Sequence, residues 1–290
     1  MELYDLHNHT IASKDGATPG RDLIDMAVER GLNGIGICDH DIFPDERLYD
    51  YAKEKGIKLA LGIEFSCYEA HIIGYNMKLN EEDKLFLEDR FKRMETDYVN
   101  NTKIVIGSLQ KKGFDITYDK VLDLYDRDKA SKLWVMKYLV DELGAFQSWA
   151  DARRYLREEK INVPDGYGIE KLYPDKVVDL IHRAGGYAIW AHPFITPEKI
   201  RNNYFNLLKK HNVDAIEAGY AYNENGYNGT ESNCEIDQIV RSKLKKLDIA
   251  VSGGSDSHFP LKTYSDLSPI RPGDFGIGQE EFEKISFMFR

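Results

Sequence analysis

The amino-terminal stretch DLHNHTIASKDG, residues 5–16, combines histidines and acids at a spacing that suits metal binding. His7 and His9 are two residues apart at the end of a predicted first strand. Residues two apart in a strand point to the same face, so both imidazoles can reach one metal ion. Asp15 follows and precedes a glycine, so a turn can bring its carboxylate over the same site. This stretch therefore predicts a metal site.

The remaining histidines extend the same pattern. Six of the eight histidines lie at or near predicted strand ends, where three acids accompany them, whereas His182 and His211 fall in predicted helices. Imidazole and carboxylate ligands together favour zinc, manganese or iron, and a set without cysteine argues against a structural zinc site. The candidate metal ligands are His7, His9, Asp15, His40, Glu64, His71, His192, Asp256 and His258.

Nine candidate ligands exceed what one ion can bind, so we expect two or three divalent ions bridged by Glu64 or Asp15. Two ions about 3.5 to 4 Å apart would share a water, lower its pKa and hold the oxygens of an in-line displacement. We expect hydrolysis of a small phosphate monoester by a metal-bridging hydroxide, with Asp15, Asp256 or a histidine assisting proton transfer. Ions that only stabilise the fold are disfavoured, because a chain of this length needs no such support.

Short predicted strands alternate with predicted helices in two parts of the chain. Strands are expected within residues 31–40, 58–66 and 70–76, and again within 187–193, 214–220 and 248–258. This alternation is typical of a parallel α/β sheet or barrel, whose chemistry lies at the carboxyl ends of the strands. The candidate ligands occupy those positions.

Residues 79–165 interrupt the alternation with long, charged, amphipathic helices, which predicts an inserted helical subdomain. The barrel would then comprise residues 1–78 and 166–290. Lys132 and Lys137 within the insertion are candidate substrate-binding residues. They lie five residues apart on a predicted helix, so at most one is expected to face the site.

The amino-acid composition indicates the cellular location of the protein and the class of its substrate. Hydrophobic residues make up 42% and charged residues 30% of the 290 residues. The sequence has no apolar run long enough to span a membrane, and its first residues do not resemble a signal peptide. These features predict a soluble, cytoplasmic protein without a membrane partner. The three cysteines have no paired spacing and are expected to be reduced. A net charge of -10 disfavours long duplex nucleic acid, whose binding depends on Lys and Arg. We therefore expect a small phosphorylated substrate, such as a nucleotide.

The motifs DLHNHTIASKDG, ICDHD, GIEFS, HIIGY, WAHP and SGGSDSH occur in this order, and through them the chain resembles the PHP (polymerase and histidinol phosphatase) family of metal-dependent phosphoesterases. The resemblance spans the predicted barrel. It implies a distorted (β/α)7 barrel with a two- or three-metal site made of the nine residues above.

The insertion after HIIGY resembles the family's subgroup that acts on nucleoside 3′,5′-bisphosphates and short RNA 5′ ends. In that subgroup the insertion caps the site and carries arginines and a histidine, where this chain has Lys132, Trp134 and Lys137. After WAHP this chain has Phe194 and Ile195, where the subgroup tends to offer an arginine. The resemblance therefore implies a nucleoside bisphosphate or a short 5′-phosphorylated oligonucleotide as substrate.

Three alternatives stay open. A histidinol-phosphate phosphatase or another small-molecule phosphatase is disfavoured by the insertion, and an amide or lactone hydrolase could use the same ions. A protein of another class would be a non-catalytic module that binds metal and a phosphorylated ligand. Such a module would be expected to lack some ligands, and no ligand position is lost here.

Overall fold

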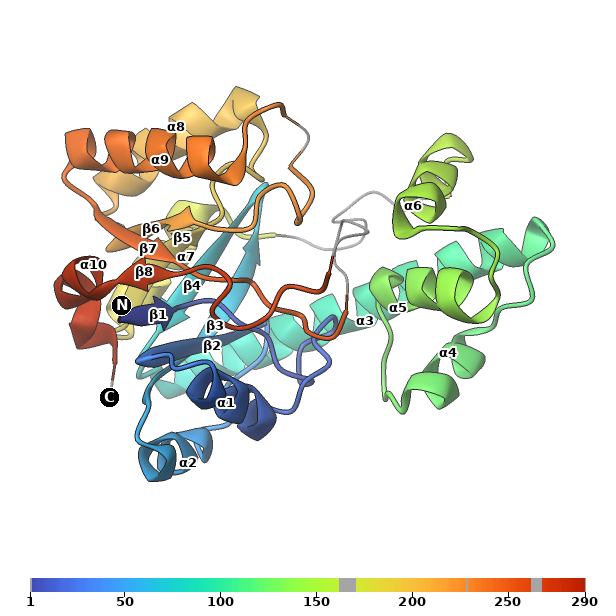
Figure 1. Cartoon of the computed structure of the whole chain (residues 1–290), viewed down its shortest axis with the longest axis horizontal. Helices are drawn as coiled ribbons and strands as arrows, with labels where there is room; N and C mark the ends of the chain where they lie inside the picture. Colours follow the sequence, from blue (N-terminus) through green and yellow to red (C-terminus); the bar gives the residue numbers. More distant parts are fainter. Residues whose placement is uncertain (1, 162–170, 228, 262–267, 290) are drawn as a thin grey trace. The chain divides into compact units, whose positions relative to one another are not determined.

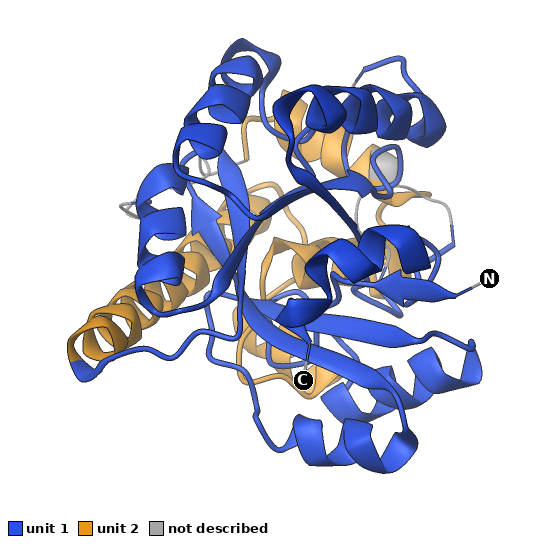
Figure 2. Ribbon diagram, turned by 90° about the vertical axis from the view of Figure 1, so that its left-hand side faces the viewer, with its two compact units in different colours: residues 1–81, 171–262, 268–290 blue, residues 82–170, 263–267 orange. Residues whose placement is uncertain are grey.

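The computed structural model describes residues 2–161, 171–227, 229–261 and 268–289 (Figure 1). The chain divides into two compact units (Figure 2). Unit 1 comprises Met1–Glu81, Lys171–Lys262 and Ser268–Arg290, and unit 2 comprises Glu82–Glu170 and Thr263–Leu267.

A mixed eight-stranded sheet, in the order β7-β6-β5-β4-β3-β2-β1-β8, forms the centre of unit 1. Its strands are β1 (Leu3–Asp5), β2 (Gly34–His40), β3 (Lys58–Cys67), β4 (Ala70–Tyr75), β5 (Tyr187–Ala191), β6 (Ala215–Gly219), β7 (Ala250–Gly253) and β8 (Ile277–Gly278).

The sheet curls into a nearly closed barrel, and the chain segments after β1 and β7 join its edges. The backbone N–H of Leu6 donates to the carbonyl oxygen of Gly253 at 3.0 Å, and that of Asp256 donates to His7 at 2.7 Å. The barrel therefore closes at the end where the candidate ligands lie. The predicted α/β barrel class is confirmed.

Strand β4 departs from the predicted parallel alternation, because it runs antiparallel to both β3 and β5. Only Tyr68 and Glu69 separate β3 from β4, and so short a connection can make a hairpin but not a crossover. The reversal places His71, at the start of β4, opposite Ser66 near the end of β3. Strand β8 is likewise antiparallel to β1, and the other pairs are parallel.

The barrel interior below the site is filled by Tyr75, whose hydroxyl donates to the carbonyl oxygen of Leu6 at 2.7 Å. The small residues of the neighbouring strands make room for this ring. A Cβ on Gly36 would lie 2.5 Å from the Tyr75 hydroxyl, and one on Gly62 would lie 2.5 Å from the ring. Cys38 is fully buried in the same core, which agrees with a packing role.

Helices cover the outside of the barrel in unit 1. Leu23, Ile24 and Ala27 form the apolar face of α1 and pack with Ile35 and Ile37 of β2. The helices are α1 (Gly20–Glu29), α2 (Leu48–Lys55), α7 (Pro174–Arg183), α8 (Glu198–Lys210), α9 (Asn233–Leu247) and α10 (Gln279–Ile285), with a 3-10 turn at Ser286–Met288.

The described part of unit 2 is built from helices, as predicted for the insertion. They are α3 (Glu81–Lys111), which begins at the last residue of unit 1, α4 (Tyr118–Tyr125), α5 (Lys132–Lys137), a π-helical turn (Tyr138–Glu142) and α6 (Trp149–Glu158). The exact domain boundaries, 78/79 and 165/166, stay a prediction, and the second lies outside the described residues. In the described ranges, no helix has both the length and the apolar character needed to cross a bilayer.

Candidate metal centre

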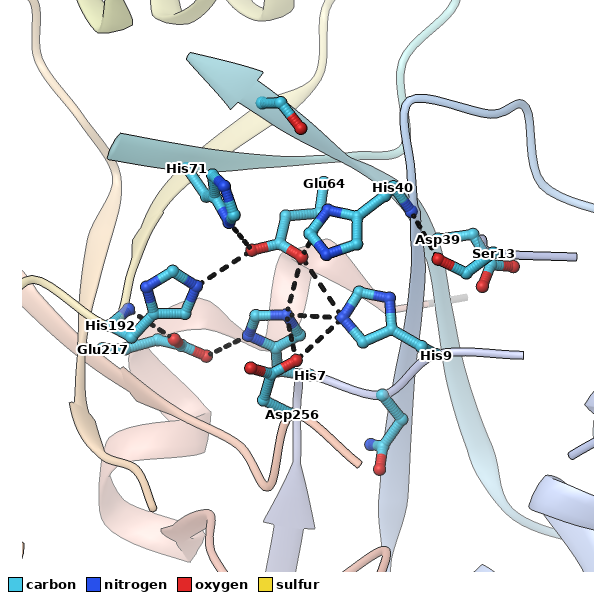
Figure 3. A network of polar contacts seen from close by, with 12 residues as sticks. His7, His9, Ser13, Asp39, His40, Glu64, His71, His192, Glu217 and Asp256 are labelled. Carbon is cyan, nitrogen blue, oxygen red and sulfur yellow. Dashed lines mark hydrogen bonds and ion pairs between the residues drawn. The ribbon is translucent and has the colours of Figure 1, made fainter. Parts of the chain in front are cut away.

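The carboxylate of Glu64, a fully buried residue of β3, lies in the middle of a histidine cluster (Figure 3). Its Oε2 atom is 3.2 Å from Nε2 of both His7 and His9, and 3.1 Å from Nδ1 of His40. The Nε2 atoms of His7 and His9 are themselves 3.1 Å apart. Three strand ends, those of β1, β2 and β3, therefore direct their nitrogen and oxygen donors to one point.

The second oxygen of Glu64 faces the other side of the barrel (Figure 3). Its Oε1 atom is 2.9 Å from Nδ1 of His71 and 3.0 Å from Nε2 of His192. His71 reaches this position only because β4 is reversed, and His192 follows the last residue of β5. One carboxylate thus contacts imidazoles from both halves of the barrel sequence.

Two aspartates complete the cluster. The Oδ1 atom of Asp256 is 2.8 Å from Nε2 of His9. The carboxylate of Asp15 lies 3.6 Å from Nε2 of His40 and 3.5 Å from Nε2 of His258. The structure therefore brings all nine sequence-predicted residues together, and their role as ligands stays a proposal.

Three groups of these side chains are each compact enough to hold one cation, because the donor atoms of a group lie within 4.8 Å of one another. His9, His40 and Glu64 each belong to two groups; the two oxygens of Glu64 could serve neighbouring ions, whereas a neutral imidazole would serve one ion. The groups are His9, Asp15, His40 and His258; His7, His9, Glu64 and Asp256; and His40, Glu64 and His71.

Unsatisfied polar atoms show that the residues fit divalent cations. Buried polar atoms normally form hydrogen bonds, since leaving one unpaired costs about 1–3 kcal/mol. Five buried nitrogen and oxygen atoms of the cluster have no hydrogen-bond partner among the described residues, although some of them lie at contact distance from one another. They are His9 Nδ1, His40 Nδ1, Glu64 Oε2, Asp256 Oδ1 and His258 Nε2. All five side chains belong to groups that could hold an ion, and oxygen and imidazole donors suit zinc, manganese or iron.

The carboxylates of the cluster are held in their charged form. Burial alone would raise the pKa of Glu64, but the charges of His40, His7 and His71 outweigh it and lower that pKa well below its usual value. Burial likewise opposes a charged His9, yet hydrogen bonds and charges from Asp256 and Glu64 raise its pKa well above the ordinary value. A cluster that attracts protons this strongly is negative enough to attract a cation in their place.

Glu217, a fully buried residue of β6, was not identified from the sequence. Its Oε1 atom is 3.0 Å from Nδ1 of His7, and its Oε2 atom accepts the backbone N–H of His192 at 2.7 Å. A carboxylate on the far nitrogen of an imidazole fixes the tautomer and directs the other nitrogen to the metal. The available signal was a lone glutamate in the otherwise apolar strand AIEAG.

Replacing Glu217 with alanine should weaken manganese binding by roughly 10- to 100-fold, because His7 would lose the group that orients it. Isothermal titration of the metal-free protein measures this change. Glu217→Gln should fall between wild type and alanine, since one amide oxygen can serve only one of the two donors. Glu54→Ala, at an exposed position of α2, is the matched control. An unaltered affinity in Glu217→Ala would rule out the orienting role.

Two further hydrogen bonds orient the aspartates. The Tyr220 hydroxyl donates to Oδ2 of Asp256 at 2.7 Å, and the Ser13 hydroxyl donates to Oδ1 of Asp15 at 2.7 Å. Burial and the charge of Asp256 raise the pKa of Tyr220 well above its usual value, so its hydroxyl stays protonated and can donate. In Asp256, Oδ1 is thereby left as the atom that faces the histidines.

The remaining residues singled out from the sequence are two lysines and two histidines. Lys132 and Lys137 both belong to α5 of unit 2. The ammonium group of Lys137 is 2.6 Å from Oδ2 of Asp141 and 5.3 Å from the centre of the Tyr125 ring. A role of either lysine in substrate binding stays a prediction. His182 and His211 contact Asp214 and Asp179, at 2.9 and 2.7 Å, on the helical side of the barrel.

Comparison with known proteins identifies relatives of this arrangement. Residues 5–171 match the model of the PHP domain. The 5′-3′ exoribonuclease of Haemophilus influenzae is 29% identical over 268 residues, which are 89% of this chain and 90% of that protein. The 5′-3′ exoribonuclease Rnm of Escherichia coli is 27% identical over 278 residues, 89% of this chain and 86% of its own length.

Two solved structures share the fold. A metal-dependent phosphoesterase of Bifidobacterium adolescentis superposes with a TM-score of 0.76 at 21% identity, covering 99% of this chain and 96% of that one. An amidohydrolase of Chromobacterium violaceum with bound sulfate superposes with a TM-score of 0.73 at 22% identity, covering 99% and 97%. At this level of identity the likeness shows the barrel architecture.

The relatives contradict the predicted partner. A small phosphorylated substrate was expected, and long duplex nucleic acid was disfavoured, yet the matched relatives are named as enzymes that degrade RNA. The expectation rested on the net charge of -10, which sums the whole surface. The end of an RNA chain that enters one site meets only the charges near that site, and metal ions there can offset the charge of its phosphates.

Proposed function

Since the chain belongs to the PHP domain family and is a metal-dependent phosphoesterase, we propose that it hydrolyses RNA from the 5′ end. The observation that carries the proposal is the cluster around Glu64, in which eight of the nine candidate side chains form three groups that could each hold an ion and the ninth, His192, contacts Glu64. The choice of RNA is supported by relatives that match along 89% of the chain and are named 5′-3′ exoribonucleases.

We propose that manganese, iron or zinc ions, two or three in number, bind at the three groups. Ions at such ligands supply an activated water at neutral pH and offset the charge of the phosphoryl group. The histidines and Glu64 hold them in place, and Glu217 keeps His7 in the correct tautomer. In the reaction, the water oxygen bonds to phosphorus, the P–O bond to the departing sugar oxygen breaks, and that oxygen takes up a proton.

Asp15 and Asp256 are the proposed proton-transfer groups. They are 8% and 7% exposed, whereas Glu64 and Glu217 are fully buried, so the two aspartates are the carboxylates of the cluster that can exchange protons with solvent. A group that passes protons must reach both the reacting atoms and water. Glu64 instead acts as a fixed ligand.

The proposed function is tested with a 3′-labelled, 5′-phosphorylated pentaribonucleotide and manganese-loaded protein. We expect products that shorten stepwise from the 5′ end, and a large loss of rate in Asp256→Asn. Adenosine 3′,5′-bisphosphate and histidinol phosphate serve as comparison substrates. Hydrolysis of histidinol phosphate alone, cleavage within the RNA without end preference, or no metal-dependent hydrolysis would each refute the proposal.

A further inference from the structure

Two exposed tyrosines contact each other at the tip of the β3–β4 hairpin. The side chains of Tyr68 and Tyr173 are 47% and 56% exposed, and their ring centres are 5.2 Å apart with an interplanar angle of 43°. Aromatic rings gain free energy by leaving water, so a pair that stays in solvent is a candidate binding surface.

The backbone beneath this pair is fixed. The N–H of Tyr68 donates to the carbonyl oxygen of Leu172 at 2.8 Å, which ties the hairpin tip to the segment that carries Tyr173. The hydroxyl of Tyr204, a buried residue of α8, donates to the carbonyl oxygen of Tyr68 at 2.9 Å. Because the backbone is already held, a ligand that stacks on the rings would lose little free energy to ordering them.

The pair lies at the same end of the barrel as the metal centre. The hairpin itself carries two members of that centre, Glu64 on β3 and His71 on β4. Tyr68 follows Glu64 by four residues, which corresponds to about 13 Å along an extended strand. A nucleic-acid chain that places one phosphate at the metal centre could therefore reach these rings with a nucleotide further along.

A cation lies on the same side of the barrel. Arg201 precedes Tyr204 by three residues, so both side chains lie on one face of α8. Its guanidinium is 3.7 Å from the centre of the Phe194 ring, and Phe194 follows His192 by two residues. The guanidinium of Arg201 donates to the carbonyl oxygen of Phe194 at 3.4 Å, and its charge is among the causes that lower the pKa of Glu231.

We propose that Tyr68, Tyr173 and Arg201 form a subsite for the nucleotides downstream of the reacting phosphate in single-stranded RNA. The bases would stack on the tyrosine rings, and the guanidinium would bind a backbone phosphate. Single strands expose unstacked bases that proteins bind on aromatic rings, with little dependence on sequence. Arginine suits phosphate because its planar donors form two parallel hydrogen bonds. The subsite rests on the proposed function, since it requires RNA as the ligand.

Binding of a 3′-fluorescent, 5′-phosphorylated pentaribonucleotide tests the subsite by fluorescence anisotropy. All proteins carry Asp256→Asn, so that the RNA is not consumed. Tyr68→Ala with Tyr173→Ala should weaken binding by about tenfold or more, and Arg201→Gln should weaken it and reduce its salt dependence. Tyr68→Phe should bind as the parent does, because the ring is retained.

Phe287→Ala is the matched control, because Phe287 is 49% exposed and packs on Tyr187 at the opposite end of β5. An RNA whose downstream nucleotides are abasic should bind the parent about as weakly as normal RNA binds the double variant.

The outcomes separate the subsite from the proposed function. If the wild type shortens RNA but the double tyrosine variant binds RNA unchanged, the subsite is wrong and the function stands. If the parent binds RNA through the tyrosines but the wild type does not shorten it, the function is wrong and the subsite stands. If the parent does not bind the RNA, the subsite is overturned.

Discussion

Replacing Glu64 with glutamine should lower kcat/KM for RNA hydrolysis by about a thousandfold or more, because loss of the central carboxylate removes several kcal/mol of metal-based stabilisation of the transition state. Glu64 is within contact distance of five histidines and belongs to two of the three candidate ion groups. Glutamine is close in size, so the variant should fold while losing the charge.

Metal content and rate should be measured together in this variant. We expect fewer bound manganese ions per chain than in the wild type, together with the loss of rate. Glu54→Gln, an exposed position on α2, should keep both values. A Glu64→Gln protein that retains full metal content and full activity would contradict the placement of the catalytic centre around Glu64.

Removing the divalent ions should lower the midpoint of thermal unfolding by about 10 °C. A ligand present at a thousandfold excess over its dissociation constant stabilises the folded state by about 4 kcal/mol, and each kcal/mol shifts the midpoint by about 2–4 °C in a chain of this size. The folded chain holds the ligands together, whereas the unfolded chain does not, so the ions bind the folded state preferentially.

This stabilisation should shrink as the pH falls. Histidine binds metal only in its neutral form, and its ordinary pKa is about 6.5. Carboxylates raise the pKa of His7 and His9 well above that value despite their burial, so protons compete with the metal from neutral pH downward. Scanning calorimetry with and without manganese at pH 8 and pH 5 measures the difference. An equal midpoint with and without manganese at pH 8, or a larger manganese effect at pH 5, would contradict a histidine-based metal centre.

Much of the site could be predicted because its residues are marked by local spacing. His7 and His9 are two residues apart, and the same is true of Asp256 and His258, so each pair is recognisable without knowledge of the fold. The alternation of strands and helices then indicated that these pairs lie at one end of a barrel. The structure places eight of the nine side chains in compact groups at that end, and His192 contacts Glu64 beside them.

Other features depend on contacts between distant parts of the chain. The reversal of β4 follows from a two-residue connection, which the alternation of hydrophobic segments does not reveal. Glu217 contacts His7, 210 residues away, and its sequence neighbours give no hint of that contact. Tyr173 contacts Tyr68 only because the segment after residue 170 bonds to the hairpin tip. The prediction of a small phosphorylated substrate was wrong because it rested on net charge, which is a property of the whole surface and not of the site.

The most direct test of the metal centre is anomalous diffraction from crystals grown with manganese. We expect two or three anomalous peaks within bonding distance of the nine side chains, with one peak shared by Glu64 and His9. Peaks confined to other parts of the chain, or none in crystals that contain manganese, would contradict the central claim that these side chains form a divalent metal site.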